Sequence, residues 1–310
     1  MPRFDLIADQ KEPAMLGGEI SYECRSLQGG EDLNLALHVW RTPRPRGNLF
    51  YIHGIQSHGG WLFETGPELA RRGIQVFALD RRGSGRSGGL RGDTPSLELL
   101  LDDYLRGFQA AVSPSGKPAL NGQDRPPFAA LGQSLGGSVL AGLVASGRLP
   151  VERLIFCAPA LGQMRAKFPP EQLEQLRTPA AATNMELTPV GLADEDYTDI
   201  PRYLRFMRND PLMLRTITRR SRATFLALED HYVGARAIWP DVPVNLILPR
   251  VDPIIRLAAA KGTLEAISVR PLEITQFNTS LHYLEFSNER ERYWDLLAQL
   301  VASPHLETVQ

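Results

Sequence analysis

The residues of this chain that are best suited to chemistry surround a serine near the middle of the sequence. Residues 132–136 read Gly-Gln-Ser-Leu-Gly, directly after the apolar run 128–131 and directly before a helix-capable stretch. Glycine two positions to either side of a serine permits a tight strand-to-helix turn that exposes the hydroxyl. We therefore take Ser134 as the candidate nucleophile. A second Gly-x-Ser-x-Gly match lies at 85–89, but no strand directly precedes its Ser87 and no helical pattern follows it.

Ser134 needs two partners before it can attack a carbonyl group, because a serine hydroxyl is a weak nucleophile near neutral pH. An imidazole must take the hydroxyl proton, and a carboxylate must orient that imidazole and stabilise its cation. His282 follows the last expected strand and Asp252 follows the strand before it. Both therefore lie at carboxyl ends of strands, where ligands gather in open α/β sheets. We predict that Ser134, Asp252 and His282 act as nucleophile, acid and base.

Other ionisable residues are poorer candidates for these roles. Asp241 comes before its strand and so lies at the opposite edge of the sheet, while His231 lies in an irregular insertion and His305 in the C-terminal tail. We interpret His53, which follows a buried strand, as a structural residue that orders the next loop. Asp80 heads a loop rich in glycine and arginine whose spacing is not that of a phosphate-binding P-loop, and we interpret it as an acceptor that stabilises the turn.

Acyl transfer also requires preorganised donors for the negative charge that develops on the carbonyl oxygen. The backbone N–H of Leu135 opens the helix that follows Ser134, and it is the first expected donor. The backbone N–H of Ile55, in the loop after His53, is the second. The sequence therefore predicts an oxyanion hole formed by Ile55 and Leu135.

Strand and helix patterns alternate through most of the chain, with short links between them. Apolar runs predict strands buried on both faces, and amphipathic stretches predict the helices between them. The expected strands are 48–53, 74–80, 128–133, 153–158, 242–248 and 272–277, and the expected helices are 61–72, 94–112, 135–146, 254–267 and 291–301. Alternating segments at 19–26 and 33–40 predict an antiparallel hairpin at the sheet edge. This succession is typical of an α/β fold whose mostly parallel sheet carries helices on both faces.

The alternation stops between residues 161 and 239. This segment is rich in proline, arginine and acidic residues, and its pattern is mostly helical without a clear strand. We therefore expect residues 1–160 and 240–310 to form one core, with 161–239 inserted as a helical cap at the rim of the sheet. Its arginines alternate with apolar residues, which fits a membrane-surface face or a solvated helix face, and we favour the second. These arginines are Arg202, Arg205, Arg208, Arg215, Arg219, Arg220 and Arg222.

Composition places the chain among ordinary globular proteins. Its 310 residues are 43% hydrophobic, and its formal net charge of −1 without a run of like charge argues against nucleic acid as a partner. Cys24 and Cys157 lie in separate expected strands, and we expect both to stay reduced. The six histidines show no metal-ligand spacing. No apolar stretch reaches the length of a spanning helix and the first residues lack a signal-peptide core, so we expect a soluble, cytoplasmic protein.

Four motifs together resemble those of a known family. They are His53-Gly54-x-x-x-His58, Asp80-x-Arg82-Gly83-x-Gly85-x-Ser87, Gly132-x-Ser134-x-Gly136-Gly137 and Asn209-Asp210-Pro211-Leu212. With them, residues 33–300 resemble the monoacylglycerol lipase/lysophospholipase branch of the α/β-hydrolases. The resemblance implies the α/β-hydrolase fold with a helical cap and hydrolysis of carboxylic esters without a cofactor. Two positions depart from the family pattern: Pro249 stands where glycine usually precedes the acid, and Tyr283 stands where glutamate usually follows the base.

We therefore expect a serine carboxylesterase that forms an acyl-enzyme on monoacylglycerol-like or lysophospholipid-like esters. The expected partner is a small acyl ester, no cofactor or metal is expected, and membrane contact, if made, is transient and runs through 161–239. Gln56, Phe206, Met207 and Leu212 are the expected substrate-binding residues. Two alternatives stay open: the same triad acting on amides or thioesters or in acyl transfer, and a hydrolase-fold binding or scaffold protein without activity.

Overall fold

A computed structural model describes residues 14–15, 19–113 and 126–303 of the chain. Its centre is a nine-stranded sheet with the order β1-β2-β3-β5-β4-β6-β7-β10-β11. Neighbouring strands run parallel from β5 to β11 and antiparallel from β1 to β5. The strands are β1 (Ala14–Met15), β2 (Ser21–Gln28), β3 (Asn34–Arg41), β4 (Gly47–Ile52), β5 (Ile74–Leu79), β6 (Phe128–Gln133), β7 (Arg153–Cys157), β10 (Val244–Pro249) and β11 (Leu272–Phe277). The expected α/β sheet with an antiparallel hairpin at one end is confirmed.

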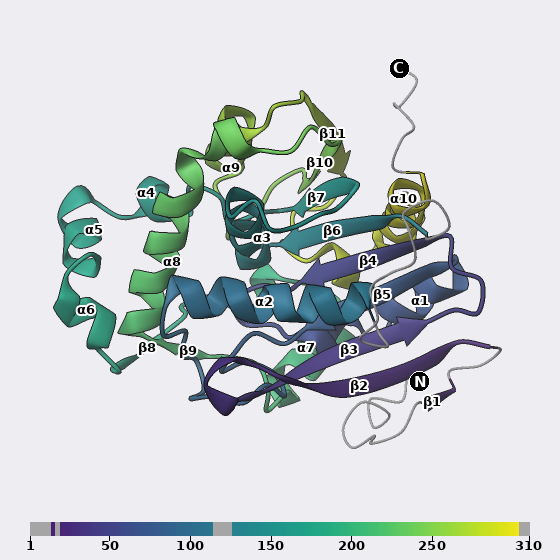
Figure 1. Ribbon diagram of the computed structural model, residues 1–310, viewed down its shortest axis with the longest axis horizontal. Coiled ribbons are helices and arrows are strands. Elements are labelled where there is room, and N and C mark those ends of the chain that lie inside the picture. The colour runs from purple at the N-terminus through teal and green to yellow at the C-terminus, as the bar shows by residue number, and fades with distance from the viewer. Residues whose placement is uncertain (1–13, 16–18, 114–125, 304–310) are drawn as a thin grey trace.

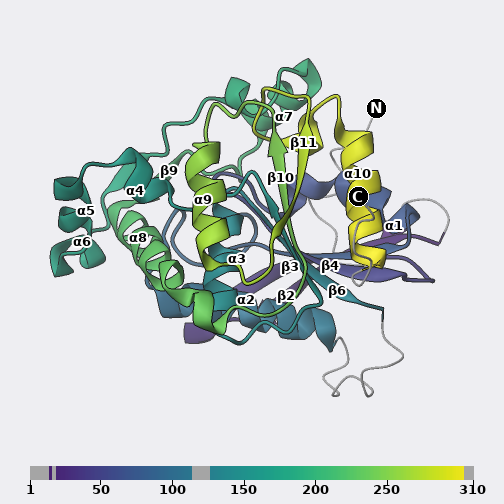
Figure 2. The same ribbon diagram turned by 90° about the horizontal axis from the view of Figure 1, so that it is seen from above.

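Helices cover both faces of this sheet (Figures 1 and 2). The helices on one face are α2 (Leu97–Val112), α3 (Leu135–Ala145), α8 (Arg219–Val233) and α9 (Leu257–Ile267), and those on the other are α1 (Thr65–Arg71) and α10 (Arg290–Ala302). Alternate residues of one strand enter the two layers: Phe50 and Ile52 of β4 pack on the α2/α3 side, whereas Leu49 and Tyr51 pack on the α1/α10 side. Burial on both faces explains why these strands are continuous apolar runs.

Helix boundaries differ from the expected ones where side chains bond to the backbone. The expected helix at 94–112 begins at Leu97, because the hydroxyl of Ser96 accepts a hydrogen bond from the N–H of Leu99 and caps the first turn. The expected helix at 61–72 is divided into a 3₁₀ turn, η3 (Gly59–Leu62), and α1. The expected loop at 113–127 and His305 lie largely or wholly outside the described residues.

The segment from 161 to 239 carries the short helices α4 (Gln163–Lys167), α5 (Pro170–Leu176), α6 (Pro179–Thr183) and α7 (Pro201–Asn209) besides α8. It also contains β8 (Leu187–Pro189) and β9 (Thr216–Thr218), which pair antiparallel, so the expectation of no strand is wrong. Strands of three residues are too short to leave a periodic pattern in the sequence. Their partners are supplied by tertiary contact between distant parts of the segment.

Four arginines of α7, α8 and the stretch between them form ion pairs with carboxylates. Arg202, Arg208, Arg215 and Arg220 pair with Glu64, Glu195, Asp194 and Asp93. These pairs tie the segment to itself and to the core, which fits the favoured interpretation of a solvated helix face. In the part of the chain that the structure describes, no helix is both long and apolar enough to cross a bilayer. Cys24 and Cys157 are both unpaired, as expected.

Candidate active site

Ser134 lies at the turn between β6 and α3, in a backbone conformation that L-residues rarely adopt. Its φ is 53° and its ψ is −123°, while the strand before it and the helix after it are regular. Its carbonyl oxygen accepts hydrogen bonds from the N–H groups of Gly137 and Ala160, at 2.8 Å each, and its own N–H donates to the carbonyl of Cys157. Three backbone bonds therefore hold the strained turn, and the side chain is left to face a cavity.

The glycines of the elbow are required by close backbone contacts. A Cβ at Gly136 would lie 1.9 Å from the carbonyl oxygen of Ile52, and one at Gly132 would lie 2.4 Å from that of Gly136. Both distances are far below any real Cβ contact. The elbow can thus form only where these positions lack a side chain.

Gly136→Ala is expected to destabilise the fold by about 3 kcal/mol or more, because β4 or α3 must shift to admit the methyl group. The matched control is Gly262→Ala in α9, where a Cβ would meet nothing within 4 Å. Since alanine is the better helix former, this control is expected to gain about 0.5–1 kcal/mol. Urea denaturation of both variants measures the difference. A Gly136→Ala protein as stable as the control would contradict the close approach.

His282 and Asp252 form a buried pair. The Nδ1 of His282 lies 2.8 Å from Oδ2 of Asp252, and neither side chain is exposed to solvent. The other carboxylate oxygen of Asp252 accepts the N–H groups of Ile254 and Ile255, at 2.8 and 2.9 Å. Burial opposes ionisation of Asp252, but the imidazole and these two N–H groups outweigh it and hold the pKa of the carboxyl below its ordinary value.

This pairing fixes the tautomer of His282. Because Nδ1–H donates to Asp252, Nε2 carries the lone pair and can accept a proton. Nε2 accepts a hydrogen bond from the side-chain amide of Gln133, at 3.2 Å, which places the imidazole beside the elbow. No hydrogen bond joins His282 to the Ser134 hydroxyl among the described residues. The structure thus brings the expected base next to the residue that precedes the expected nucleophile.

The 161–239 segment holds the His282 loop from the other side. The backbone N–H of His282 donates to the carbonyl of Asp196, at 2.9 Å, and the ring of Tyr197 packs edge-on against the imidazole. Tyr197 in turn donates its hydroxyl proton to the side chain of Gln56, at 2.8 Å. His282 is therefore positioned jointly by the sheet and by this segment.

The loop after β4 is held by a buried arginine. The guanidinium group of Arg81, two residues after the end of β5, donates to the carbonyl oxygens of Gly54 and Ile55, at 3.0 and 2.9 Å. The backbone N–H of Arg81 donates to Nε2 of His53. Burial lowers the pKa of His53 to about 3, so the ring stays neutral and accepts this bond. Because both loop carbonyls bond to Arg81, Ile55 is fixed beside Leu135, against which it packs. The structural role expected for His53 is confirmed.

Ser134 opens into a cavity of about 220 Å³ between the elbow and the 161–239 segment. Ile55 and Leu135, the two expected N–H donors, both line it. Since Leu135 is the first residue of α3, its N–H has no partner within the helix. Most of the remaining lining residues come from 161–239: the apolar Met164, Phe168, Val190, Leu192, Ile217 and Phe225, and the polar Gln163, Lys167, Arg222 and Glu229.

The four expected substrate-binding residues do not line this cavity. Gln56 is buried and bonded to Tyr197, and Met207 is fully buried in the core. Phe206 and Leu212 line a different, larger cavity. Sequence order within the segment does not reveal which of its helices and strands face Ser134. Residues of α4, β9 and α8 line the Ser134 cavity, and no residue of α7 does.

The second Gly-x-Ser-x-Gly match is structural. The hydroxyl of Ser87 donates to the carbonyl oxygen of Asp80, at 2.6 Å, and accepts the N–H of Ala36. The Asp80 carboxylate accepts the N–H groups of Gly59 and Arg86, so it stabilises this turn as expected. Burial opposes ionisation of Asp80, but the neighbouring histidine side chains outweigh it and lower its pKa.

Three residues of the site escaped the sequence analysis. Gln133 donates a hydrogen bond to His282, and Arg81 donates one to the carbonyl of Ile55. The carbonyl of Asp196 accepts the backbone N–H of His282. Arg81 had a usable signal, because a charged residue directly after a buried strand lies at the sheet edge where sites form. Asp196 acts through its backbone, and no side-chain pattern reveals that.

The order of the mostly parallel strands and the serine at the strand-to-helix turn define the α/β-hydrolase fold. The structure resembles a monoglyceride lipase of Saccharomyces cerevisiae solved with a substrate analogue, with a TM-score of 0.76 and 15% identity over 95% of this chain and 99% of that one. It resembles a monoacylglycerol lipase of Paleococcus ferrophilus with a TM-score of 0.71 and 19% identity over 87% of this chain and 98% of that one. At such identities the likeness concerns the fold.

Sequence comparison places the chain within a family. The model of the Hydrolase_4 family, described as serine aminopeptidase, S33, matches residues 43–291, and the chain belongs to this family. A monoacylglycerol lipase of Mycolicibacterium smegmatis is 31% identical over 117 residues, 37% of this chain and 39% of that protein. A protein phosphatase methylesterase 1 of Gibberella zeae is 28% identical over 128 residues, 40% of this chain and 31% of that protein. These alignments span well under half of each relative, and the expected hydrolase class is confirmed at the level of the family.

Proposed function

We propose that the chain is a serine carboxylester hydrolase that works through an acyl-enzyme, with Ser134 as nucleophile, His282 as base and Asp252 as the residue that orients the base. The observation that carries the proposal is the buried Asp252–His282 pair, whose Nε2 bonds to Gln133 directly beside the strained elbow. His282 takes the Ser134 proton as the hydroxyl oxygen attacks the ester carbonyl, and then gives it to the leaving alcohol. A water molecule, activated by the same imidazole, releases the acid and restores Ser134.

The oxyanion of each tetrahedral intermediate is stabilised in this proposal by the N–H groups of Ile55 and Leu135. Both residues line the Ser134 cavity and pack against each other. Arg81 supports the first donor, because its bond to the Gly54 carbonyl fixes the orientation of the peptide plane that carries the Ile55 N–H. Each such donor typically contributes about 2.7–4 kcal/mol to lowering the barrier.

The 161–239 segment serves in this proposal as a cap over the acyl group, with residues 1–160 and 240–310 as the core. The segment supplies most of the residues of the cavity wall, six of them apolar, and its backbone holds His282. The names of the sequence relatives, a monoacylglycerol lipase and a methylesterase, favour esters. The cavity of about 220 Å³ is smaller than typical ligand pockets of roughly 300–1,000 Å³, which favours a short acyl chain.

A series of p-nitrophenyl esters of increasing chain length tests this assignment. We expect kcat/KM to be highest for acyl chains of about four to eight carbons and to fall for longer ones. A fluorophosphonate probe is expected to label native protein at Ser134, and not heat-denatured protein. A protein that folds but neither reacts with the probe nor cleaves any ester would be the binding or scaffold protein of the alternative.

The second candidate is amide hydrolysis by the same residues. The family description, a serine aminopeptidase, favours it. Matched p-nitroanilides of the same acyl groups separate the two candidates. A higher kcat/KM on the anilides than on the esters would replace the ester proposal.

A further inference from the structure

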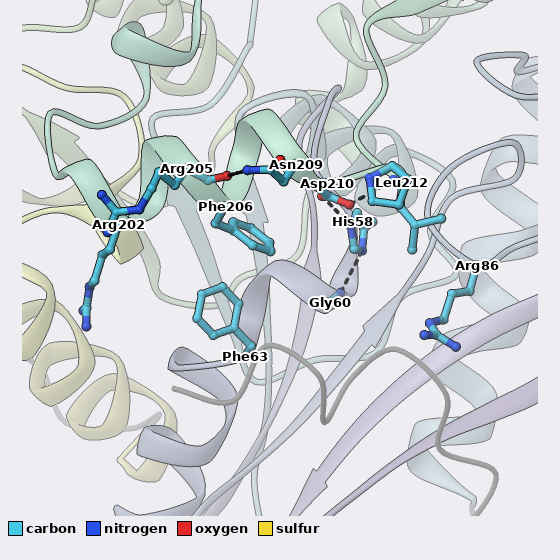
Figure 3. Close-up of a pocket in the computed structure, with 11 residues that line it drawn as sticks. His58, Gly60, Phe63, Arg86, Arg202, Arg205, Phe206, Asn209, Asp210 and Leu212 are labelled. Atoms are coloured by element: carbon cyan, nitrogen blue, oxygen red, sulfur yellow. Dashed lines mark hydrogen bonds and ion pairs between the residues drawn. The ribbon is translucent and has the colours of Figure 1, made fainter. Parts of the chain in front are cut away.

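A larger cavity lies apart from the Ser134 cavity and shares no lining residue with it. It measures about 690 Å³ and lies between η3 and α7, as Figure 3 shows. Its lining consists of His58, Gly60, Phe63, Arg86, Arg202, Arg205, Phe206, Asn209, Asp210, Pro211 and Leu212. This volume is within the usual range for a small-molecule site, and no step of the proposed hydrolysis uses it.

The middle of this cavity is apolar. The rings of Phe63 and Phe206 face it side by side, with centroids 5.0 Å apart, and Leu212 lies farther along (Figure 3). Phe206 also packs against Trp61 and Phe286, so the aromatic surface is held rigidly from behind. An apolar surface of this kind, with its two rings tilted 59° to each other, suits an alkyl chain.

Three arginines line the cavity: Arg202 and Arg205 lie at one end, and Arg86 lies near Leu212 at the other (Figure 3). Arg202 and Arg205 lie about one turn apart on α7, and both line the cavity on the side of the aromatic pair away from Leu212 (Figure 3). Arg202 pairs with Glu64, at 3.1 Å, whereas no ion pair of Arg205 is found in the described part of the chain. Two guanidinium groups with one carboxylate between them leave positive charge at this end.

The carboxylate that lines the cavity does not neutralise this charge. Asp210 accepts hydrogen bonds from Nε2 of His58, at 3.0 Å, and from the indole N–H of Trp61, at 2.7 Å. Burial opposes its ionisation, but these two donors outweigh it and hold the pKa of Asp210 below its ordinary value. Its oxygens are thus engaged at the opposite end of the cavity from Arg202 and Arg205.

We propose that this cavity binds an amphiphilic anion, an alkyl chain with a single carboxylate or phosphate head. The head lies against the guanidinium groups of Arg202 and Arg205, and the chain lies over Phe63 and Phe206 toward Leu212. Guanidinium groups bind both kinds of head, so the charge and the apolar surface together define the ligand class. Binding does not depend on hydrolysis at Ser134.

Isothermal titration calorimetry with octanoate and octyl phosphate tests the site, using Ser134→Ala protein so that turnover plays no part. We expect one binding site per chain, with octanol, acetate and inorganic phosphate binding at least tenfold more weakly. Tighter binding of octanoate identifies the head as a carboxylate, and tighter binding of octyl phosphate identifies it as a phosphate. Acetate or phosphate binding as tightly as its octyl counterpart would overturn the amphiphilic site.

Variants locate the site. Arg205→Gln is expected to weaken octanoate or octyl phosphate about tenfold, since each 1.4 kcal/mol of lost interaction is a factor of ten. The matched control is Arg208→Gln on the same helix, whose side chain pairs with exposed Glu195 and does not line the cavity. Met164→Ala in the Ser134 cavity is the second control, and thermal melting verifies that each variant folds. Equal weakening by Arg205→Gln and Arg208→Gln, or weakening by Met164→Ala alone, would overturn the proposal.

Discussion

Ser134→Ala is expected to lower kcat for a short-chain p-nitrophenyl ester by roughly 10⁴- to 10⁶-fold, with the fold intact. The hydroxyl makes no hydrogen bond that holds the turn; the backbone of Ser134 makes those bonds through its N–H and carbonyl groups. Alanine therefore removes the proposed nucleophile and keeps the backbone conformation of the elbow. Steady-state kinetics and thermal melting of wild type and variant measure the two effects separately.

The chain supplies its own control in the second serine motif. Ser87→Ala removes the hydrogen bonds to Asp80 and Ala36 and is expected to cost about 1–3 kcal/mol of stability. It is expected to leave turnover per folded molecule unchanged. The opposite pattern, with hydrolysis lost in Ser87→Ala and kept in Ser134→Ala, would mean that the elbow serine is not the nucleophile.

Asp252→Asn is expected to lower kcat/KM by about 10³- to 10⁴-fold without unfolding the protein. The N–H groups of Ile254 and Ile255 both donate to Oδ1 of Asp252, so the amide oxygen of asparagine must take that place. The amide NH₂ then faces Nδ1 of His282 as a donor. The imidazole is forced to carry its proton on Nε2, where it can no longer accept one from Ser134.

The pH dependence of stability checks the same pair independently. Because the pKa of Asp252 is lowered in the folded state, its ionised form contributes stability above the unfolded value of about 3.9 and loses it as pH falls through the folded pKa. Asp252→Asn lacks this contribution, so wild type is expected to lose more stability than the variant between neutral and strongly acidic pH. Asp241→Asn, at an exposed pair with Arg270, is the control expected to leave both stability and kcat/KM unchanged. Full activity in Asp252→Asn would remove Asp252 from the mechanism.

Some features follow from the sequence because their causes lie within a few residues. The elbow is one, since the contact that requires Gly132 is with Gly136, within the tight turn that Ser134 makes between a strand and a helix. The alternation of buried strands and amphipathic helices is another, and it led to the correct sheet. The shared location of Ser134, Asp252 and His282 followed in turn, because the carboxyl ends of parallel strands meet at one edge of the sheet.

The substrate side of the molecule was decided by tertiary structure alone. Phe206 and Leu212 were expected beside Ser134, yet they line the separate cavity under α7, while Met164 and Phe225 face the serine. The sequence of an amphipathic helix shows that one of its faces is buried. It does not show which neighbouring element packs against that face.

The sequence by itself thus determined the candidate nucleophile, its expected partners and the fold that places them. Only the packing of the 161–239 segment on the sheet decided the size of the Ser134 cavity, the backbone support of His282 by Asp196, and the second cavity with Arg205. The physical reason is the range of the interactions. Turn sterics and strand periodicity act between near neighbours in the chain, whereas each cavity wall joins side chains from segments far apart in sequence, whose meeting no local pattern records.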